Sequence, residues 1–386
     1  MKAGVHEGLQ VLSWIHDRLE LRRLVRWAER EAVALESSER VLLDLFGECS
    51  LIYLAESDHF VHEAHVMRRA VLPPLLRMGA TAVLEELSAA DGRVLQRFLQ
   101  SGDAAALDQV ATFGDSSGLR SDRDDRLGGL LRDQGGRYPF AAMKSEHRWS
   151  LEALRPFPHD HIGIDLDAVP GAAYRELRLE RVPGDSRASE MDRLRAWLAE
   201  HPSDLAIVEP LLDGLELVEA SHRARSWAEV EAALARREEG MIRRAELALG
   251  RGHTRAVVVG HCGHLSRARG VVRLDDRAGP PPRALGVALA EGRRVGAIWM
   301  LHAEGTSSHP FADVPTRHGV RRGTVNAALA GVGEAFFLPI RGTEGERLLS
   351  TEQLLSWSFG ARFRASLAAV ADAVVFFRTV TPLRAS

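Results

Sequence analysis

The chain has 386 residues, of which 45% are hydrophobic, so it is long enough to bury a sizeable core without disulfide or metal staples. The 50 Lys and Arg residues nearly balance the 53 Asp and Glu residues, and the net charge of -3 gives no reason to expect a nucleic-acid or membrane partner. No apolar run approaches the roughly 20 residues that cross a bilayer. With only Cys49 and Cys262 and no charged-then-apolar leader, the sequence favours a cytoplasmic protein without structural disulfides.

The first part of the chain predicts a strand, a helix and a second strand. Apolar residues recur at helical spacing over 11–34, which predicts an amphipathic packing helix ahead of them. The run 51–54 predicts a buried strand, and the helical pattern from about His62 to Leu72 is expected to close at Pro73-Pro74. The run 82–84 predicts the next strand. Strand, helix and strand in this order form a βαβ unit, so we expect the two strands to be parallel.

The rest of the chain continues the alternation of strands and helices. The segment 115–136 is rich in Asp, Arg and Gly and fits either a lid or a plain solvated loop. The segment 188–247 is predicted to be mostly helical, with breaks near His201-Pro202 and Asp213-Gly214. The pattern as a whole predicts an α/β fold with a central, mostly parallel β-sheet flanked by helices. Its further strands are predicted at 162–165, 256–259, 295–300, 335–338 and 373–377.

Two of these strands end in clusters of residues that can do acid-base chemistry. Glu56 and His59 follow the strand 51–54, and His261 and His264 follow the strand 256–259. Ligands of open α/β sheets bind beyond the carboxyl ends of the strands, so we expect these four side chains in one crevice. A carboxylate three residues before an imidazole can orient that imidazole as a general base for water. Polar residues are also ordinary in turns, so the Glu-x-x-His spacing alone is a weak signal.

The second cluster, His261-Cys262-Gly263-His264, leaves several functions open. Together with Glu56 and His59, the two histidines would satisfy a zinc or manganese ligand set. Alternatively one histidine donates to a developing oxyanion while His59 handles the proton. Both histidines could instead be rim residues without a chemical role. A nucleophilic Cys262 would need a base and an oxyanion hole that the sequence does not specify.

Three further charged residues are candidates for the same crevice. Glu85 is predicted to end its strand there, and because side chains alternate along a strand, one of Glu85 and Glu86 points inward and the other outward. Arg68 has a guanidinium that could clamp a carboxylate or a polarised carbonyl. It reaches the site together with His59 only if His59 lies on the turn before the helix begins. Glu63 is placed to pair with His59 or to be an exposed helix carboxylate.

Two common enzyme classes lose support. No Gly-rich phosphate loop follows the first strand, and the Gly-x-Ser-x-Gly match at Gly114-Asp115-Ser116-Ser117-Gly118 does not follow a predicted strand, as a nucleophile elbow would. Nucleotide binding and the serine-hydrolase route are therefore disfavoured.

Taken together, these motifs resemble the erythromycin esterase-like family, whose core is related to the haem-binding ChaN-like and Tiki-type proteins. The family pattern is a strand ending in Gly-Glu-x-x-His, a Glu four residues later, an Arg on the next helix, a Glu closing the next strand, and a later His-Asn-x-His. The corresponding residues here are Glu56, His59, Glu63, Arg68, Glu85, His261 and His264. This sequence departs from the pattern at Ala55, which stands for the Gly, and at Cys262, which stands for the Asn.

The resemblance implies a fold and a set of roles. It implies one erythromycin esterase-like domain over 1–386, with an N-terminal helical segment at 1–47 and helical lid insertions over the cleft at 100–160 and 184–240. It also implies hydrolysis of a macrolactone ester without metal or other cofactor, with His59 as general base. The implied catalytic residues are His59, Glu56, Glu85 and His261, and the implied substrate-binding residues are Arg68, His264 and Glu63.

Three hypotheses follow for the function. The first is a hydrolase of an ester, lactone or similar acyl bond in a natural product, in which His59 activates water. The second is a protein of natural-product biosynthesis that binds a peptide or precursor in the same cleft, altered at Ala55 and Cys262, and hydrolyses nothing. The third is a metal- or haem-binding protein. In the first two, the partner is a small-molecule or peptide natural product, and the sequence gives no oligomeric state.

Overall fold

The structure is a computed structural model, and it describes residues 20–110, 140–166, 171–180, 182, 186–223, 226–268, 273–274, 284–308, 315–356 and 362–384. The segment 115–136, with its lid or loop interpretation, lies outside the described residues, as does the start of the helix predicted over 11–34. Within the described part of that prediction, residues 20–31 are helical.

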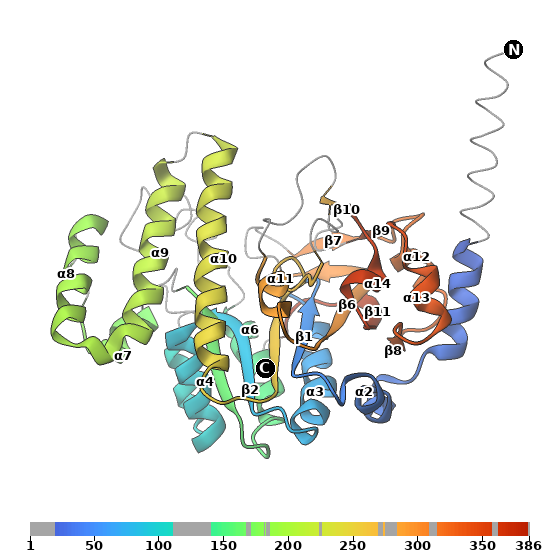
Figure 1. The fold of residues 1–386 in the computed structure, drawn as a ribbon, viewed down its shortest axis with the longest axis horizontal. Coiled ribbons are helices and arrows are strands. Elements are labelled where there is room, and N and C mark those ends of the chain that lie inside the picture. Colours follow the sequence, from blue (N-terminus) through green and yellow to red (C-terminus); the bar gives the residue numbers. More distant parts are fainter. Residues whose placement is uncertain are drawn as a thin grey trace, which may run out of the picture.

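A mostly parallel sheet of eight strands forms the centre of the fold (Figure 1). Its strand order is β3-β2-β4-β1-β6-β11-β8, with β7 paired to β6. β8 runs antiparallel to β11 and β7 antiparallel to β6, while the other neighbours are parallel. The strands are β1 (Leu51–Glu56), β2 (Ala82–Ser88), β3 (Asp160–Asp165), β4 (Ala256–His261), β6 (Val295–Ser307), β7 (Thr316–His318), β8 (Ala335–Pro339) and β11 (Ala373–Val380).

A small antiparallel sheet lies outside the main one, with the order β5-β10-β9. Its strands are β5 (Arg273–Leu274), β9 (Gln353–Ser356) and β10 (Arg362–Ala365). Phe363 of β10 packs against Trp299 of the main sheet, with ring centroids 6.4 Å apart. The small sheet therefore covers part of the main one.

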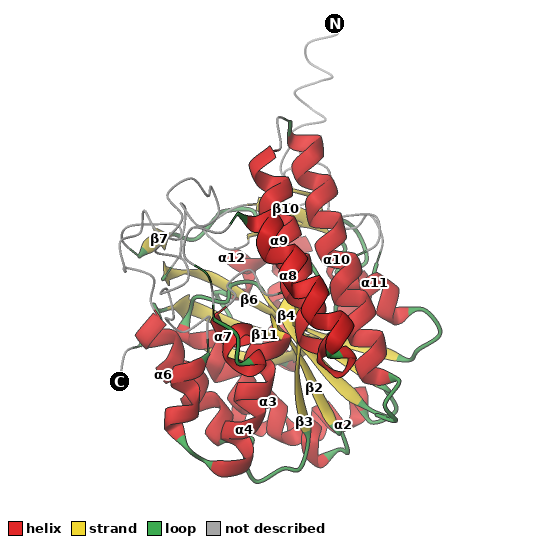
Figure 2. Cartoon of the chain, turned by 90° about the vertical axis from the view of Figure 1, so that its left-hand side faces the viewer, coloured by secondary structure: helices red, strands yellow, loops and turns green. Residues whose placement is uncertain are grey.

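Helices cover both faces of the main sheet, because its strands are apolar on both sides. Leu51 and Tyr53 of β1 join the apolar cluster of α10 (Trp227–Leu249), whereas Ile52 and Leu54 join the cluster of α3 (His62–Arg77). Such continuous apolar runs are typical of parallel strands covered on both faces. Figure 2 shows the sheet between α3 and α4 (Ala89–Ser101) on one side and α10 and α11 (Leu285–Ala290) on the other.

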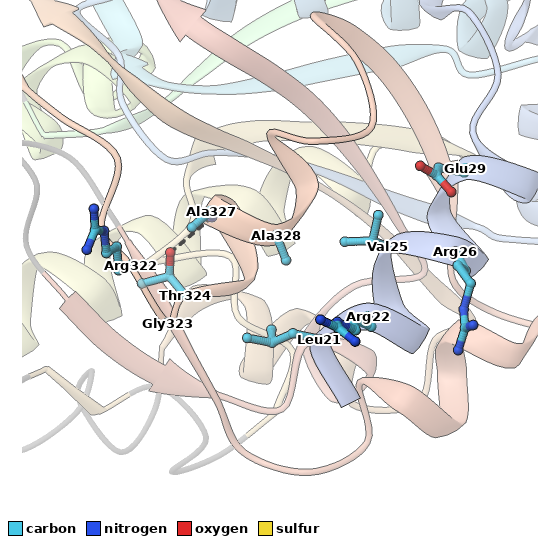
Figure 3. Close-up of a pocket in the computed structure, with 10 residues that line it drawn as sticks. All are labelled: Leu21, Arg22, Val25, Arg26, Glu29, Arg322, Gly323, Thr324, Ala327 and Ala328. Atoms are coloured by element: carbon cyan, nitrogen blue, oxygen red, sulfur yellow. Dashed lines mark hydrogen bonds between the residues drawn. The ribbon is translucent and has the colours of Figure 1, made fainter. Parts of the chain in front are cut away.

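The helices of the α3 face are α2 (Glu39–Phe46), α3 (His62–Arg77), α4 (Ala89–Ser101) and α6 (Phe140–Glu152), with short 3-10 turns at Leu35–Ser37 and Ala104–Gln109. The opposite face carries the helix 20–31, α10 (Trp227–Leu249), α11 (Leu285–Ala290), α12 (Val325–Leu329), α13 (Glu344–Leu348) and α14 (Leu367–Val370). A shallow surface groove of about 500 Å³ separates the helix 20–31 from α12 (Figure 3).

Three helices form a group with an apolar cluster of its own, outside the β3 edge of the sheet. They are α7 (Gly171–Leu177), α8 (Arg187–Glu200) and α9 (Leu205–Arg223), with a 3-10 turn at Pro202–Asp204. Figure 1 shows α8 and α9 beside α10 and extending past the sheet. This group occupies most of the predicted insertion 184–240.

The helix predicted to close at Pro73-Pro74 continues to Arg77, so that part of the prediction was wrong. Two prolines remove two backbone donors from the helix, which normally ends it. Here Leu75 and Leu76 remain buried against the sheet and hold the last turn in place. The helix ends instead at Gly79, which adopts a φ of +92° and donates its N–H to the Leu76 carbonyl.

The break predicted at Asp213-Gly214 is also absent, because α9 runs unbroken through both residues. The Asp213 carboxylate accepts hydrogen bonds from Arg243 at 3.1 Å and Arg244 at 2.7 Å, both on α10. These contacts between helices outweigh the weak local preference of an Asp-Gly pair for a turn.

Helix α4 packs against β3 with no room for a side chain between them. A Cβ on Gly92 would lie 2.2 Å from the backbone nitrogen of Gly163, far inside van der Waals contact. We therefore expect Gly92→Ala to lower the free energy of unfolding by about 1–3 kcal/mol, although alanine favours helix over glycine by ~1 kcal/mol. Urea denaturation measures the change. As a matched control, Gly319→Ala should leave stability nearly unchanged, because nothing lies within 4 Å of its Cβ position.

Within the described residues, no helix combines the length and the apolar character that crossing a membrane requires.

Candidate active site

Four neighbouring strands bring their carboxyl ends together at one edge of the sheet. In the order β3, β2, β4 and β1, these ends carry Asp165, the pair Glu85-Glu86, His261 and Glu56. Glu56 is paired in register with His261 across β1 and β4. The topology therefore places residues from distant parts of the sequence side by side.

A buried ion-pair network underlies this edge on the α3 face. Arg68 of α3 donates from Nε to Glu56 at 2.5 Å and from Nη2 to the same carboxylate at 3.0 Å, and its Nη1 binds Glu85. Glu85 also contacts His161 of β3 at 2.7 Å and His147 of α6 at 3.4 Å. Burial raises the pKa of Glu56 and Glu85, but the charge of Arg68 and the hydrogen bonds from histidines together outweigh burial and hold both pKa values below their usual range.

His59 lies on the turn between β1 and α3, which begins at His62. This is the condition under which His59 and Arg68 both reach the site. The His59 Nδ1 is 2.8 Å from Glu56 Oε2, and its Nε2 is 3.5 Å from Glu86 Oε2. These two contacts hold the imidazole in place. Because its side chain is 27% exposed, it remains accessible to a ligand. Burial lowers the pKa of His59, but the hydrogen bonds to Glu56 and Glu86 outweigh it and raise this pKa to about 10.

Glu86 is the common partner of several groups on the opposite face of the sheet. It accepts from Arg237 Nη2 at 2.8 Å and from the backbone N–H of His261 at 2.7 Å, and it lies 3.3 Å from His264 Nε2. Burial raises the pKa of Glu86, but His264 and His59 together lower it well below its usual range. Glu86 is therefore an ionised carboxylate that links the two histidine clusters.

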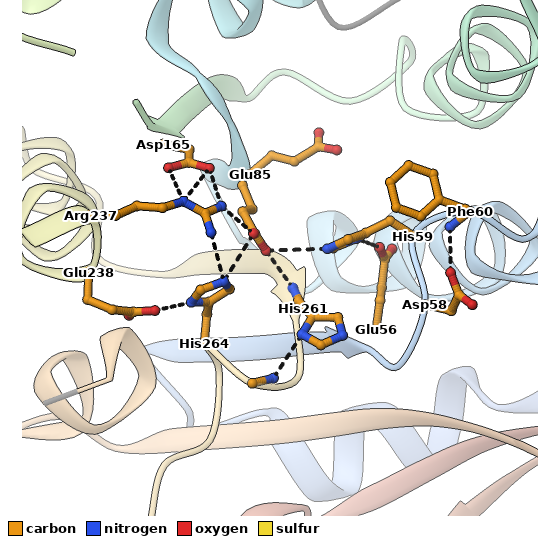
Figure 4. A network of polar contacts seen from close by, with 12 residues as sticks. Glu56, Asp58, His59, Phe60, Glu85, Asp165, Arg237, Glu238, His261 and His264 are labelled. Carbon is orange, nitrogen blue, oxygen red and sulfur yellow. Dashed lines mark hydrogen bonds and ion pairs between the residues drawn. The ribbon is translucent and has the colours of Figure 1, made fainter. Parts of the chain in front are cut away.

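His261 has the opposite electrostatic character to His59. Burial and the neighbouring charge of His59, whose ring centroid is 5.3 Å away, lower the pKa of His261 to about 3. The backbone N–H of Gly263 donates to His261 Nδ1 at 3.3 Å (Figure 4). The neutral ring consequently carries its proton on Nε2, which makes it a hydrogen-bond donor at neutral pH.

His264 is held by two carboxylates, Glu86 and Glu238 of α10. Burial lowers the pKa of His264, but these two carboxylates outweigh it and raise the pKa to about 10. Glu238 also accepts the backbone N–H of Leu285 at 2.9 Å, which ties the start of α11 to the site. The site thus contains a neutral imidazole between two cationic ones.

The predicted site residues do not all lie together. Glu56, His59, His261 and His264 converge, as Figure 4 shows. Glu85 does not contact the histidines of the two motifs, because β2 continues to Ser88 and its alternation turns Glu85 to the α3 face and Glu86 to the α10 face. Arg68 is buried between Glu56 and Glu85, in a position to hold Glu56 rather than to meet a ligand directly.

Glu63 lies apart from the group. Its carboxylate accepts from the backbone N–H of Thr381 at 2.7 Å and from the Thr381 hydroxyl at 2.8 Å. These bonds attach the start of α3 to the segment that follows β11. The structure therefore gives Glu63 a contact with the chain itself and none with His59.

Neither departure from the family pattern distorts the site. Ala55 lies in the regular pairing of β1 and is not among the described non-glycine residues with positive φ, so glycine is not required there. Cys262 points into the apolar cluster of the α10 face, and burial raises the pKa of its thiol. Its side chain is thus placed for packing, while its backbone N–H donates to the Glu56 carbonyl at 2.8 Å.

Sequence reasoning did not assign Glu86, Arg237, Glu238 or Asp165 to the site. Arg237 donates to both Asp165 oxygens, at 3.0 Å and 3.2 Å from Nε, and so fixes α10 to the end of β3. The available signals were that Asp165 ends a predicted strand and that Glu86 follows Glu85. Arg237 and Glu238 lie within a charged helix whose pattern is that of a solvated face.

Within the described residues, no three His, Cys, Asp or Glu side chains are arranged to hold a metal ion. The carboxylates that a metal would need are already bound by Arg68 and Arg237.

Comparison with known proteins gives likenesses in structure only. No family model matches the chain, and no curated protein is significantly similar to it in sequence. Two crystal structures, of a Bacillus cereus protein and of a succinoglycan biosynthesis protein, each match with a TM-score of 0.66. The Bacillus cereus protein is 16% identical in sequence, and the match covers 95% of this chain and 99% of that one. The succinoglycan biosynthesis protein is 15% identical, and the match covers 95% of this chain and 98% of that one.

The third likeness is to a variant of the erythromycin esterase EreC in its open conformation, with a TM-score of 0.59 and 16% identity over 91% of this chain and 97% of that one. At such identities the likeness shows the fold alone. The chain therefore has an erythromycin esterase-like fold: a mostly parallel central sheet flanked by helices, with the candidate site at the carboxyl ends of its strands.

Proposed function

We propose that this protein is an esterase-type hydrolase that cleaves an ester, lactone or similar acyl bond of a natural product. The observation that carries the proposal is the pairing of His59, oriented by buried Glu56, with the neutral donor His261 at 5.3 Å between ring centroids. Acyl-bond hydrolysis needs a base for water and a donor for the oxyanion, and this pair offers both. The likeness in fold to an erythromycin esterase supports this choice over other reactions.

In the proposed reaction His59 Nε2 takes a proton from water while Glu56 holds the ring through Nδ1. The water oxygen attacks the acyl carbon, and the negative charge that develops on the carbonyl oxygen is stabilised by the His261 Nε2–H and by cationic His264. Arg68 acts as a positioning residue, since it fixes Glu56. The proton then passes from His59 to the leaving oxygen as the tetrahedral intermediate collapses.

This role requires that His59 lose the proton that its two carboxylate partners stabilise. With a pKa of about 10, only about one molecule in a thousand has a neutral His59 at pH 7. The Glu86 contact at Nε2 is 3.5 Å long, so a substrate that displaces it removes part of the stabilisation of the imidazolium. The proposal therefore predicts a rate that rises with pH.

Glu86→Gln tests this electrostatic argument. The substitution removes the negative charge that helps to raise the pKa of His59, so this pKa should fall from about 10 towards its ordinary value. The rising limb of kcat/KM, which reports the free enzyme, should shift to lower pH by about one unit or more. Glu238→Gln is the matched control, because Glu238 contacts His264 and not His59. An unshifted profile in Glu86→Gln would contradict the assignment of His59 as base.

The experiment that tests the function is hydrolysis of a panel of macrocyclic lactones, linear esters and amides by the purified chain, followed by mass spectrometry. In water labelled with oxygen-18, the acid product should gain one labelled oxygen, since water attacks the acyl carbon. Absence of turnover across the panel at pH 7 to 10 would count against the hydrolase.

One observation favours a second function, a binding protein for a peptide or natural-product precursor. His59 is a cation between two carboxylates, which is a stable arrangement for binding and a poor resting state for a base. If the panel gives no turnover while a peptide or macrocycle binds, and His59→Ala binds it equally well, the binding function replaces the enzymatic one.

A further inference from the structure

A large cavity of about 1160 Å³ lies between β3, α4, α9 and α10. It borders the first half of β3, from Asp160 to Gly163, and the last turn of α10, whereas the candidate active site lies at the other end of these elements. Apolar side chains, among them Ile162, Leu205 and Pro210, form much of its wall. This volume is at the upper end of the range of small-molecule binding pockets.

Positive charge is concentrated on this wall, where five arginines border the cavity: Arg93, Arg97, Arg243, Arg244 and Arg251. Arg97 pairs with Glu176 and Arg243 with Glu209, both of which also line it. The side chains of Arg93 and Arg251 have no hydrogen-bond or ion-pair partner among the described residues. Of the other lining carboxylates, Glu246 is bound by Arg293 outside the cavity, and Asp160 lies 3.4 Å from His253 Nε2. The arginines therefore exceed the carboxylates that are free to neutralise them.

Two buried side chains on the wall each have a polar atom without a partner. Arg244 is 8% exposed; it uses Nε for the Ile164 carbonyl and Nη1 for Asp213, but its Nη2 has no partner. His161 is 4% exposed, and its Nδ1 likewise has none. Buried polar atoms are nearly always hydrogen-bonded in native proteins, so the buried Arg244 nitrogen without a partner is a donor for which the chain supplies no acceptor, on a residue that borders the cavity.

We propose that this cavity binds an amphipathic organic acid, with its apolar body against Ile162 and Pro210 and its carboxylate or phosphate group on the arginines. Arg244 supplies the buried donor, and Arg93 and Arg251 supply unpaired charge at the surface. The cavity is separate from the candidate active site, and the contacts of His161 with Glu85 and of Glu85 with Arg68 link the two.

The test uses a fluorescent anionic probe, anilinonaphthalene sulfonate, titrated into the full-length protein. We expect saturable binding that decanoate and decyl phosphate displace at concentrations at least about tenfold lower than decanol does, since a charge-assisted hydrogen bond is worth about that factor or more. Whichever of decanoate and decyl phosphate binds more tightly shows whether the site prefers a carboxylate or a phosphate group. The double variant Arg93→Gln, Arg251→Gln should bind the probe about tenfold more weakly, because it removes two exposed charges.

Three further variants locate the probe. Ala206→Trp places a large ring on the cavity wall and should weaken binding as well. Arg40→Gln changes an exposed arginine of α2, far from the cavity in the fold, and should leave the affinity unchanged. His59→Ala should also bind normally, whether or not the hydrolase proposal holds. The proposal fails if no displaceable binding occurs, if decanol competes as well as decanoate, if the cavity variants bind like the wild type, or if His59→Ala abolishes binding.

Discussion

His59→Ala is expected to lower kcat/KM for ester or lactone hydrolysis by about 10²- to 10⁴-fold, the usual contribution of a general base. The fold should survive, because Glu56 keeps both bonds from Arg68 and Glu86 keeps its contacts with Arg237 and His264. The loss should appear mainly in kcat, since the base acts in the transition state more than in binding.

The matched control for this variant is His201→Ala. His201 stacks on Trp197 at 3.8 Å between ring centroids, at the end of α8 and away from the strand ends, so its loss should leave turnover unchanged. Initial rates on the best substrate of the panel, measured from pH 6 to 10, provide the comparison. If His59→Ala turned over the substrate within a few-fold of the wild-type rate, His59 would not be the general base. Glu86 would then be the next candidate for that role.

The main features of this site could be predicted because they depend on strand ends. An apolar run that stops at Glu56, and another that stops at His261, predict two strands without further information. The rule that ligands bind beyond the carboxyl ends of parallel strands then brings both ends together. The condition that His59 precede its helix could also be stated in advance, and α3 begins at His62.

The choice between Glu85 and Glu86 could not be made from the sequence. Alternation along a strand says that the two side chains face opposite sides, but it does not say which side holds the histidines. That depends on the position of β4 between β2 and β1, and on the continuation of β2 past Glu85. Both facts come from long-range pairing, which local patterns do not contain.

The site residues that α10 contributes could not be predicted from the sequence for a related reason. Arg237 and Glu238 belong to a run of charges on a long helix, and the spacing of these charges does not distinguish a solvated face from one turned towards Glu86. The unbroken helices through Pro73 and through Asp213 show the same limit, since packing against the sheet and ion pairs with α10 override the local signals there.

Arg68→Met is expected to lower the free energy of unfolding at pH 7 by about 3–5 kcal/mol, the cost of leaving buried charges without their partner. Arg68 is 7% exposed, and Glu56 and Glu85, which it joins, are 0% and 4% exposed. Methionine fills much of the volume but leaves two buried carboxylates supported only by histidines. The shift of the urea midpoint, at an unchanged slope, measures the loss.

The pH dependence of this loss identifies its cause. In the wild type the pKa values of Glu56 and Glu85 are lowered, so their contribution to stability is present above the unfolded-state pKa of about 4.3 and is lost as pH falls. Without Arg68, burial raises both pKa values and the ionised forms become destabilising. The difference between variant and wild type should therefore be largest at neutral pH and shrink as pH falls to about 4 and below, because the carboxylates of the folded variant become protonated first and those of the unfolded chain follow.

Two matched variants complete the experiment. Arg68→Lys keeps one positive charge but lacks the planar fork that bridges two carboxylates, so its loss should be intermediate. Arg77→Met removes a guanidinium from the same helix whose partner, Glu39, is exposed to solvent, and should have a much smaller effect. If Arg68→Met were as stable as Arg77→Met, or if its loss were the same at pH 4 and pH 7, the buried ion pairs would not be what holds Glu56 in place beneath His59. The orientation of the candidate base would then have to come from the turn itself, where the Phe60 N–H donates to Asp58 at 2.8 Å.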